Sequence, residues 1–236
     1  MQVIGHRGAA ALAPENTWES FDVALQIGVD AIETDIRATR DRELVLIHDA
    51  SLKRTTGAQG LVHTTPWPML RVSDAGSWFA ERFAGARIPR LEDTLIRYGP
   101  LTYLVLEIKQ AGIEEQALEM VRDLGLLGRV TFTSFEFACI RKIKAQATSA
   151  KVGFLTPDTT RRNVMRVVDA GWEQFCPPAS RVTRGDVARW KALGLEVRAW
   201  GVKDEDLMTR AIGARVDGMT VDFPHLLLRA LGRGHG

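Results

Sequence analysis

Residues 103–109 read Tyr-Leu-Val-Leu-Glu-Ile-Lys, a short apolar run that ends in one acidic and one basic side chain. A run of this length and aliphatic content is typical of a buried strand. Side chains two apart on a strand share a face, so Glu107 and Lys109 are expected to project together. In barrel enzymes, reactive residues lie at the carboxyl ends of such strands, where the connecting loops converge. The stretch therefore predicts a strand with chemistry at its end.

The same pattern recurs along the chain on both sides of this stretch. Short apolar runs alternate with longer amphipathic runs, as in repeated strand–helix units around a parallel sheet. The predicted strands are residues 3–5, 31–36, 44–48, 103–109, 130–134, 152–155, 174–176, 197–201 and 219–222. The predicted helices are residues 17–27, 114–124, 136–146, 160–170, 183–192 and 205–212, several of them ending at Gly28, Gly171, Gly194 or Gly213. We therefore predict an α/β fold, a (β/α)8 TIM barrel in a single domain over residues 1–236.

Two regions depart from this pattern. The nine strands are one too many for an eight-stranded barrel, and the connection between 31–36 and 44–48 is too short for a helical crossover. Either this connection is a bare extended segment, or one of the later strands lies outside the barrel. Residues 50–91, which follow His48-Asp49, contain scattered glycines and prolines together with aromatic residues. They predict an inserted segment with its own small core.

Composition narrows the possible functions. The 31 basic and 29 acidic residues are interspersed and leave a net charge of +2, which argues against a nucleic-acid-binding surface. Cys139 and Cys176 are too few for a disulfide framework, match no zinc motif and are interpreted as buried. The chain has neither a long apolar span nor a signal-peptide pattern, so we expect no membrane insertion and a cytoplasmic protein. A homo-oligomer is neither predicted nor excluded.

Acidic residues at the predicted strand ends suggest a metal site. Glu33 and Asp35 share a face of their strand, and Glu107 ends another. Carboxylates gathered in one cavity repel one another unless a cation neutralises them. Their oxygens suit one divalent cation, Mg²⁺ or Ca²⁺, better than zinc. The alternative is that Glu33 and Asp35 are ordinary exposed charges.

Histidines and basic residues occur at the same strand ends. His6 and His48 each end a predicted strand, and an imidazole exchanges protons near neutral pH, although a structural role for each stays open. Arg7 and Lys109 add positive charge that suits an anion such as phosphate, unless they only form salt bridges to Glu33 or Glu107. Three further histidines are interpreted as surface or packing residues: His63, His225 and His235.

The ordered motifs of the chain resemble the signature of glycerophosphodiester phosphodiesterases. The resemblance covers nearly the whole chain and runs through His6-Arg7-Gly8, Pro14-Glu15-Asn16-Thr17, Glu33-Thr34-Asp35, His48-Asp49, Arg54-Thr55-Thr56-Gly57, residues 74–79, residues 88–92, residues 106–109, Ala199-Trp200, Asp217-Gly218 and Asp222-Phe223-Pro224. Any one of these motifs is weak evidence, but their number, order and spacing are specific. Residues 50–91 correspond to the insertion that distinguishes this family.

The resemblance implies both an activity and roles for particular residues. It implies metal-dependent hydrolysis of a small glycerophosphodiester to glycerol 3-phosphate and an alcohol. The implied metal ligands are Glu33, Asp35 and Glu107. The implied general acid and base are His6 and His48. The residues implied to hold the phosphate are Arg7 and Lys109.

The chain departs from the family pattern at two places, and several alternatives stay open. Gly201-Val202-Lys203 follows Trp200 where the family often has Thr-Val-Asn, and Val221 stands where a threonine often precedes the last aspartate. Trp200 is either an apolar wall under the glycerol or a core aromatic residue. Trp67, Trp78 and Phe79 of the insertion would supply an apolar rim to a phospholipase C- or D-like or lysophospholipase D-like enzyme acting on lipids. A non-catalytic sugar-phosphate-binding barrel is the remaining alternative.

Overall fold

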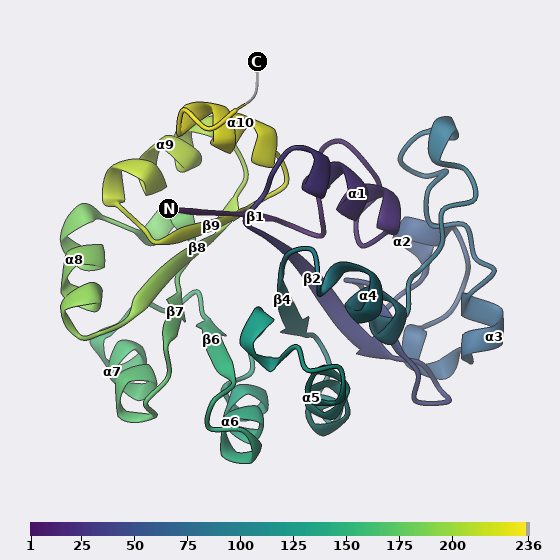
Figure 1. Ribbon diagram of the computed structural model, residues 1–236, viewed down its shortest axis with the longest axis horizontal. Helices are drawn as coiled ribbons and strands as arrows, with labels where there is room; N and C mark the ends of the chain where they lie inside the picture. The colour runs from purple at the N-terminus through teal and green to yellow at the C-terminus, as the bar shows by residue number, and fades with distance from the viewer. Residues whose placement is uncertain (235–236) are drawn as a thin grey trace.

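Eight parallel strands close into a barrel in the computed structural model, which describes residues 1–234. The strands are β1 (Gln2–Gly5), β2 (Ala31–Ala38), β4 (Tyr103–Ile108), β5 (Val130–Ser134), β6 (Lys151–Leu155), β7 (Gln174–Cys176), β8 (Glu196–Val202) and β9 (Gly218–Val221). They pair in the order β1-β9-β8-β7-β6-β5-β4-β2, and β2 pairs again with β1 to close the ring. Helices surround the strands (Figure 1). The predicted α/β fold and (β/α)8 barrel are confirmed.

One of the nine predicted strands, residues 44–48, lies outside the ring. β3 (Leu44–Leu46) pairs antiparallel with the end of β2, where Ile36 is opposite Leu46. The turn between them is closed by the Thr39 N–H, which donates to the Glu43 carbonyl at 2.9 Å. So short a connection permits a hairpin but no crossover. The explanation that a later strand lies outside the barrel was wrong, because β3 is the strand outside it. The connection contains no helix, as the other explanation held, but it is a tight turn and not an extended segment.

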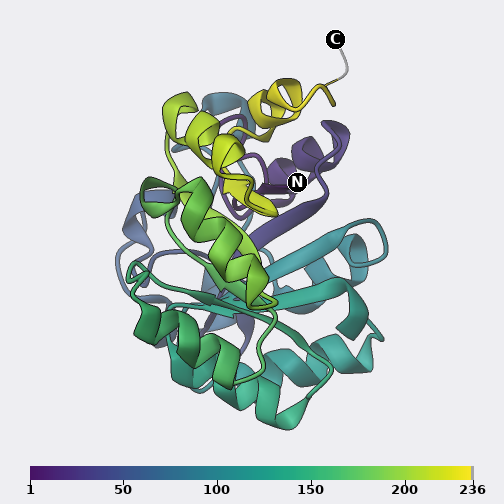
Figure 2. The ribbon, with the colours of Figure 1, turned by 90° about the vertical axis from the view of Figure 1, so that its left-hand side faces the viewer.

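The outer layer consists mainly of helices that follow the strands (Figure 2). They are α1 (Trp18–Gln26), α4 (Leu91–Tyr98), α5 (Glu114–Asp123), α6 (Phe137–Gln146), α7 (Arg161–Asp169), α8 (Arg184–Ala192), α9 (Glu205–Ala214) and α10 (Pro224–Ala230), with short 3₁₀ turns at Leu127–Arg129 and Ala179–Arg181. The side chains of Thr17, Thr183 and Asp204 cap α1, α8 and α9 by accepting a backbone N–H of the first turn.

The predicted helices were incomplete at three places. The sequence did not predict α4, which follows the insertion directly, or α10, which begins with a proline. The expected end of α9 at Gly213 was also wrong. The helix continues to Ala214, and Arg215 takes the left-handed conformation (φ 63°) that ends it. A single glycine near a helix end is therefore only an approximate stop signal.

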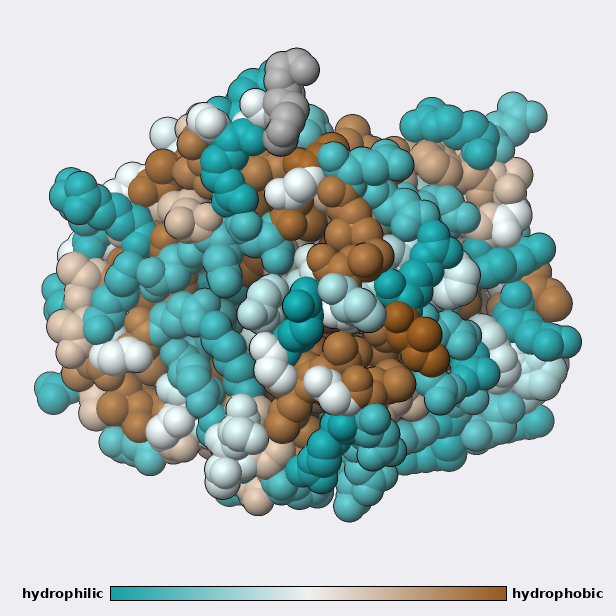
Figure 3. Space-filling model, in the orientation of Figure 1, coloured by the Kyte–Doolittle hydropathy of each residue, from teal (hydrophilic) through white to brown (hydrophobic). Residues whose placement is uncertain are grey.

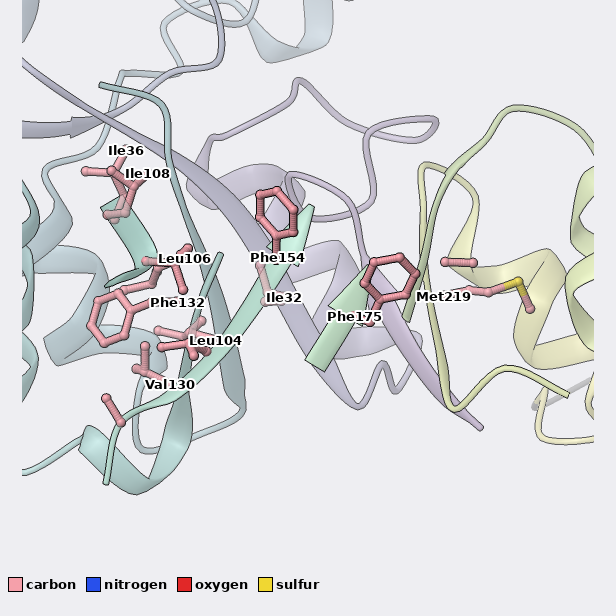
Figure 4. Close-up of a cluster of buried hydrophobic side chains, with 14 of the residues drawn as sticks. Ile32, Ile36, Leu104, Leu106, Ile108, Val130, Phe132, Phe154, Phe175 and Met219 are labelled. Atoms are coloured by element: carbon pink, nitrogen blue, oxygen red, sulfur yellow. The ribbon is translucent and has the colours of Figure 1, made fainter. Parts of the chain in front are cut away.

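The alternation of side chains along each strand separates the core from the site. Residues of one parity face the helices and are buried there, among them Ile32, Leu104, Leu106 and Phe132 (Figure 4). Residues of the other parity face the barrel interior, where a small apolar cluster consists of Ile4, Ala31 and Val105. Polar side chains of the same parity continue toward the carboxyl ends of the strands. The strands therefore pack against helices on one face and carry the site residues on the other.

Residues 50–91 pack mainly among themselves beside the barrel (Figure 1). They contain α2 (Lys53–Thr56), α3 (Trp67–Leu70) and 3₁₀ turns at Val62–Thr64 and Glu81–Phe83. Their buried cluster, completed by two residues of the preceding segment, comprises Val45, Ile47, Leu52, Val62, Leu70, Ala75 and Ile88. Hydrophilic and hydrophobic residues are interspersed on the face of the molecule shown in Figure 3. None of the helices within residues 1–234 is long and apolar enough to span a membrane.

Candidate active site

The loop after β1 brings the first two predicted site residues into the wall of one cavity. The His6 N–H donates to the Val221 carbonyl at 2.9 Å and ties the loop to β9. Arg7 then takes a left-handed backbone (φ 52°), and Gly8 follows at φ 93°. A Cβ at Gly8 would lie 2.3 Å from Ser20 Oγ, so only glycine fits this turn. The chain reverses sharply here and leaves the His6 and Arg7 side chains facing the cavity.

Three carboxylates from two neighbouring strands meet in the barrel interior. Glu33 and Asp35 share a face of β2, and Asp35 is in register with Glu107 on β4. One oxygen of each carboxylate lies within 4.8 Å of the others. The three residues are only 2%, 0% and 8% exposed, respectively. The structure thus brings together the three predicted metal ligands, and they are not the exposed charges of the alternative interpretation.

The pKa values of these carboxyls reflect the cost of burying them together. Burial and the charge of Asp35 raise the pKa of Glu33 to about 7. The same two effects raise the pKa of Glu107. Burial opposes ionisation of Asp35 too, but the charges of Arg7 and Lys109 outweigh it and lower the pKa of that carboxyl. The cluster therefore concentrates negative charge that the surrounding protein offsets only in part.

The carboxylate cluster fits a hard divalent cation. Glu33 Oε1 and Asp35 Oδ1 are buried and have no hydrogen-bond partner within residues 1–234. The Lys109 ammonium lies 3.7 Å from Asp35 Oδ1, which is beyond hydrogen-bond range. Buried carboxylate oxygens without partners are costly, and a bound cation would satisfy them. A donor set made only of oxygens suits Mg²⁺ or Ca²⁺.

An aspartate from the last barrel strand orients the His6 imidazole. His6 Nδ1 lies 2.5 Å from Asp222 Oδ1, and His6 Nε2 lies 3.9 Å from Glu33 Oε2. A carboxylate can only accept, so Nδ1 carries the hydrogen and Nε2 faces Glu33. Burial disfavours the charged imidazole, but the Asp222 hydrogen bond and the Glu33 charge outweigh burial and raise the pKa of His6.

His48 reaches the cavity by a different route. The Ile47 N–H donates to the Asp35 carbonyl at 3.0 Å, so the β2–β3 hairpin carries the next residue, His48, back to the barrel mouth. The sequence suggested that His48 ends a strand of the barrel. In the structure it follows β3, which lies outside the barrel. Its Nδ1 lies 2.7 Å from Asp49 Oδ1. Burial lowers the pKa of His48 despite the nearby Asp35 charge, so the two imidazoles are shifted in opposite directions.

Arg7 is held by several carboxylates. Its Nε lies 3.2 Å from Asp35 Oδ2, and its Nη1 donates to Glu15 Oε1 at 2.6 Å. Its contact with Glu33 is made by the backbone N–H, at 3.1 Å, and not by the guanidinium. Glu15 also accepts from Arg54, which links Arg7 to the loop beyond His48. Arg7 therefore forms salt bridges, as the alternative interpretation expected, but its side-chain partners are Asp35 and Glu15.

Lys109 forms a salt bridge, as the alternative interpretation of this residue expected. Its Nζ donates to Glu107 Oε1 at 2.7 Å and lies 5.8 Å from the centre of the Phe135 ring. It also lines the same cavity as the two histidines. The ammonium that pairs with Glu107 therefore also faces the cavity.

The cavity that these residues line has a volume of about 260 Å³. Trp200 forms part of its wall, with the ring centre 4.9 Å from that of Phe135 in an edge-to-face arrangement. The indole N–H of Trp200 donates to the Cys176 carbonyl at 2.9 Å, which fixes the ring. Trp200 is only partly buried and belongs to neither the large core nor the smaller buried clusters, so it is a wall residue and not a core aromatic.

Two of the remaining histidines, His63 and His225, do not line this cavity. His63 is exposed in the insertion, and His225 is half-buried on α10. Neither lines the cavity, in line with their interpretation as surface or packing residues. His235 lies outside the described residues.

Sequence reasoning assigned no role to several residues that support the site. Asp222 and Asp49 contact the two imidazoles, and the Asn16 amide donates to Asp35 Oδ2 at 2.9 Å. Asn16 Oδ1 accepts from the Thr34 hydroxyl, so the amide is held on both sides. All of them stand within the quoted motifs, and that position was the available signal. The motifs do not indicate which contact each residue makes.

Comparison with known proteins identifies the family. The model of the glycerophosphoryl diester phosphodiesterase family matches residues 6–226. A glycerophosphodiester phosphodiesterase of Caldanaerobacter subterraneus subsp. tengcongensis is 32% identical over 98% of both chains. A crystal structure of a glycerophosphodiester phosphodiesterase from Agrobacterium tumefaciens superposes with a TM-score of 0.87 at 29% identity, over 97% of this chain and 99% of that one.

A further structural relative contains a bound product. A phosphodiesterase of Oleispira antarctica, solved in complex with the product sn-glycerol-3-phosphate, superposes with a TM-score of 0.87 at 28% identity. The match covers 98% of this chain and 97% of that one. Together, these findings show that the chain belongs to the glycerophosphoryl diester phosphodiesterase family and is an enzyme of that class.

Proposed function

We propose that the protein hydrolyses small glycerophosphodiesters to glycerol 3-phosphate and an alcohol, and that it requires Mg²⁺ or Ca²⁺. The observation that carries the proposal is the cluster of three buried carboxylates beside one cavity, which Glu33, Glu107 and both imidazoles line. Family membership supports the same reaction, as does the product bound to the Oleispira antarctica relative.

The two imidazoles supply the proton transfers. His6 and His48 line the same cavity, and each is hydrogen-bonded through Nδ1 to an aspartate. That bond fixes the tautomer and leaves Nε2 as the reactive nitrogen. One imidazole takes the proton of the attacking oxygen, which belongs either to water or to a hydroxyl of the substrate's glycerol moiety, and the other protonates the departing alcohol. Attack by the glycerol hydroxyl gives a cyclic phosphate, which water then opens to glycerol 3-phosphate. Each transfer contributes typically ~10²–10⁴-fold to the rate.

Basic side chains hold the phosphate group, and the carboxylate cluster would hold the cation. Glu33, Asp35 and Glu107 would bind the divalent cation, which when bound offsets the charge of the phosphoryl oxygens and makes phosphorus more electrophilic. Arg7 and Lys109 hold the remaining phosphate oxygens. Arg7 Nε forms a salt bridge with Asp35 but has no well-aligned hydrogen bond within residues 1–234.

The direct test is turnover of glycerophosphocholine and glycerophosphoethanolamine by the purified protein. Glycerol 3-phosphate should appear with Mg²⁺ or Ca²⁺ and should fall to background with EDTA. The His6→Ala and His48→Ala variants should lose turnover by orders of magnitude while their circular dichroism stays native. The exposed His63→Ala variant is the matched control. Wild-type rates from His48→Ala would overturn the proposed mechanism.

A lipid substrate is the second candidate, because apolar residues are exposed on the insertion. Met69, Val72 and Trp78 are 63%, 64% and 40% exposed, whereas Trp67 packs against the buried cluster. Only part of the predicted apolar rim therefore reaches the surface. Lysophosphatidylcholine turnover and sedimentation with phosphatidylcholine vesicles separate the two candidates. A preference for the lysophospholipid over glycerophosphocholine would favour the lipid enzyme.

A further inference from the structure

A buried arginine inside the barrel has one donor without a partner. Arg198, on β8, is 2% exposed and lines the active-site cavity. Its Nε donates to Gln174 Oε1 at 2.9 Å, and its Nη1 donates to Thr220 Oγ1 at 2.5 Å. Both acceptors are neutral. Its Nη2 is buried and has no hydrogen-bond partner within residues 1–234. A buried guanidinium N–H left unpaired in a cavity is a ready donor to a ligand oxygen.

Two neighbouring strands fix this guanidinium in place. Gln174 on β7 is itself held, because its amide donates to Glu196 Oε1 at 2.9 Å. Thr220 on β9 precedes Val221, the residue that stands where the family often has threonine. Val221 packs in the outer core, whereas Thr220 faces the cavity, as alternation along a strand requires. The Thr220 hydroxyl therefore supports Arg198 from the barrel interior.

A second buried polar atom without a partner lines the same cavity. Thr133 Oγ1, on β5, is fully buried and has no hydrogen-bond partner within residues 1–234. Between β5 and β7, Gly153 on β6 contributes no side chain. A Cβ there would lie 2.7 Å from Gln174 Oε1 and 3.2 Å from Thr133 Cγ2. Only glycine at this position leaves room for the Thr133 side chain and for Gln174, the residue that holds Arg198.

The position of these groups indicates which part of the substrate meets them. Trp200 is partly exposed and Lys203 is exposed on one side of the cavity, whereas Arg198 and Thr133 form a buried floor. In the proposed reaction the phosphorus lies beside the two histidines, which line the same cavity. An alcohol of varying size needs the open end, and the small, constant glycerol moiety fits the closed end. A hydroxyl complements both groups, because it accepts from Nη2 and donates to Oγ1.

We propose that Arg198 and Thr133 form a subsite that binds the terminal, non-phosphorylated hydroxyl of the substrate's glycerol moiety. This assignment rests on the proposed function. It makes Arg198 a specificity-determining residue that selects a polyol at the closed end of the cavity. The competing explanation is that Arg198 only offsets the charge of the carboxylates across the barrel. In that case any cation would serve, and the Thr133 hydroxyl would have no role.

The test compares glycerophosphocholine with its 1-deoxy analogue, in which propane-1,2-diol replaces glycerol. The wild-type protein should favour the hydroxylated substrate by roughly 10²-fold in kcat/KM, because the analogue leaves a buried donor and a buried acceptor unpaired. Thr133→Val, Arg198→Met and Arg198→Lys should each reduce this preference about tenfold or more, mainly by weakening turnover of the hydroxylated substrate. Thr131→Val, two residues earlier on β5 and away from the cavity, is the control and should keep the preference.

Binding gives a second readout that does not depend on turnover. Calorimetric titration of the Ca²⁺- or Mg²⁺-loaded protein should show tighter binding of glycerol 3-phosphate than of propane-1,2-diol phosphate, and Thr133→Val should remove most of the difference. An Arg198→Lys variant with the wild-type preference would support charge balance and overturn the subsite. Equal losses on both substrates, or no preference in the wild type, would overturn it as well.

The outcomes separate this inference from the proposed function. If the wild-type protein turns over no glycerophosphodiester, the proposed function fails. If it turns them over with a preference that the variants leave unchanged, only the subsite fails. Should Arg198→Met not fold, Thr133→Val still decides, because it removes a hydroxyl that has no partner and keeps the shape of the side chain.

Discussion

Replacing Glu33 by glutamine should stabilise the metal-free protein at alkaline pH. The pKa of Glu33 rises from 4.5 to about 7 in the fold, through burial and the Asp35 charge. Each pKa unit corresponds to about 1.4 kcal/mol, so ionising this carboxyl costs the metal-free fold about 3 kcal/mol above pH 7. Glutamine keeps the size and one acceptor oxygen but carries no charge. The Glu33→Gln variant should therefore be about 3 kcal/mol more stable than wild type at pH 8.

The sign of the pH dependence follows from the raised pKa. Below pH 4.5 the Glu33 carboxyl is protonated in both the folded and the unfolded state, and it costs nothing. As the pH rises toward 7, the unfolded chain releases the proton first, so the folded state loses stability. At pH 5 the difference between variant and wild type should be less than about 1 kcal/mol.

Urea unfolding in EDTA, followed by circular dichroism at pH 5 and pH 8, measures this difference. At pH 8 the melting temperature should rise by roughly 6–12 °C in the variant. Added Mg²⁺ or Ca²⁺ should stabilise the wild type far more than the variant, since the variant lacks one ligand charge. The exposed Glu119→Gln substitution is the control. A Glu33→Gln variant that is less stable than wild type at pH 8, or equally shifted at both pH values, would refute the reasoning.

Three further predictions follow from contacts around the site and one helix end. Asp222→Asn should lower kcat roughly 10²-fold with little change in KM, because the hydrogen bond that fixes the His6 tautomer is lost. A wild-type kcat would show that this contact does not matter. Arg54 holds the pKa of Asp49 well below its ordinary value, and this contribution to stability is lost as the pH falls below about 4. The Arg54→Met variant should therefore lose less unfolding free energy than wild type between pH 7 and pH 3. An equal loss in variant and wild type would count against this prediction. Arg215→Gly should raise the free energy of unfolding by at most about 1 kcal/mol, because glycine takes the left-handed conformation freely, and a lower melting temperature in calorimetry would contradict this.

Much of the fold could be predicted because local patterns encode burial and backbone preference. Residues 103–109 form a strand that ends in Glu107 and Lys109, as the alternation of side chains indicated. Glu33 and Asp35 project from one face of β2 for the same reason. Helix starts at Thr17 and Thr183 follow from side chains that accept backbone N–H groups. These features depend on neighbours only a few residues away, so the sequence is sufficient to predict them.

The site could be predicted in its residue types but not in its contacts. His48 was placed at the end of a barrel strand, whereas it arrives through an antiparallel hairpin that packs against β2. The spacing of the chain excludes a crossover there but does not say which strand leaves the barrel. The sequence does not identify Arg198 and Thr133 as site residues, because an arginine within a strand and a threonine at a strand end are common. Their significance depends on which side chains lie opposite them.

By itself, the sequence determined the strand–helix alternation, the polar residues at the strand ends and the family. Only the tertiary structure decided which of those residues meet. His6 and Asp222 are 216 positions apart, and they meet because β1 pairs with β9 when the barrel closes. The physical reason is that closure depends on the summed pairing and packing of all eight strands, and no short stretch of sequence contains that information.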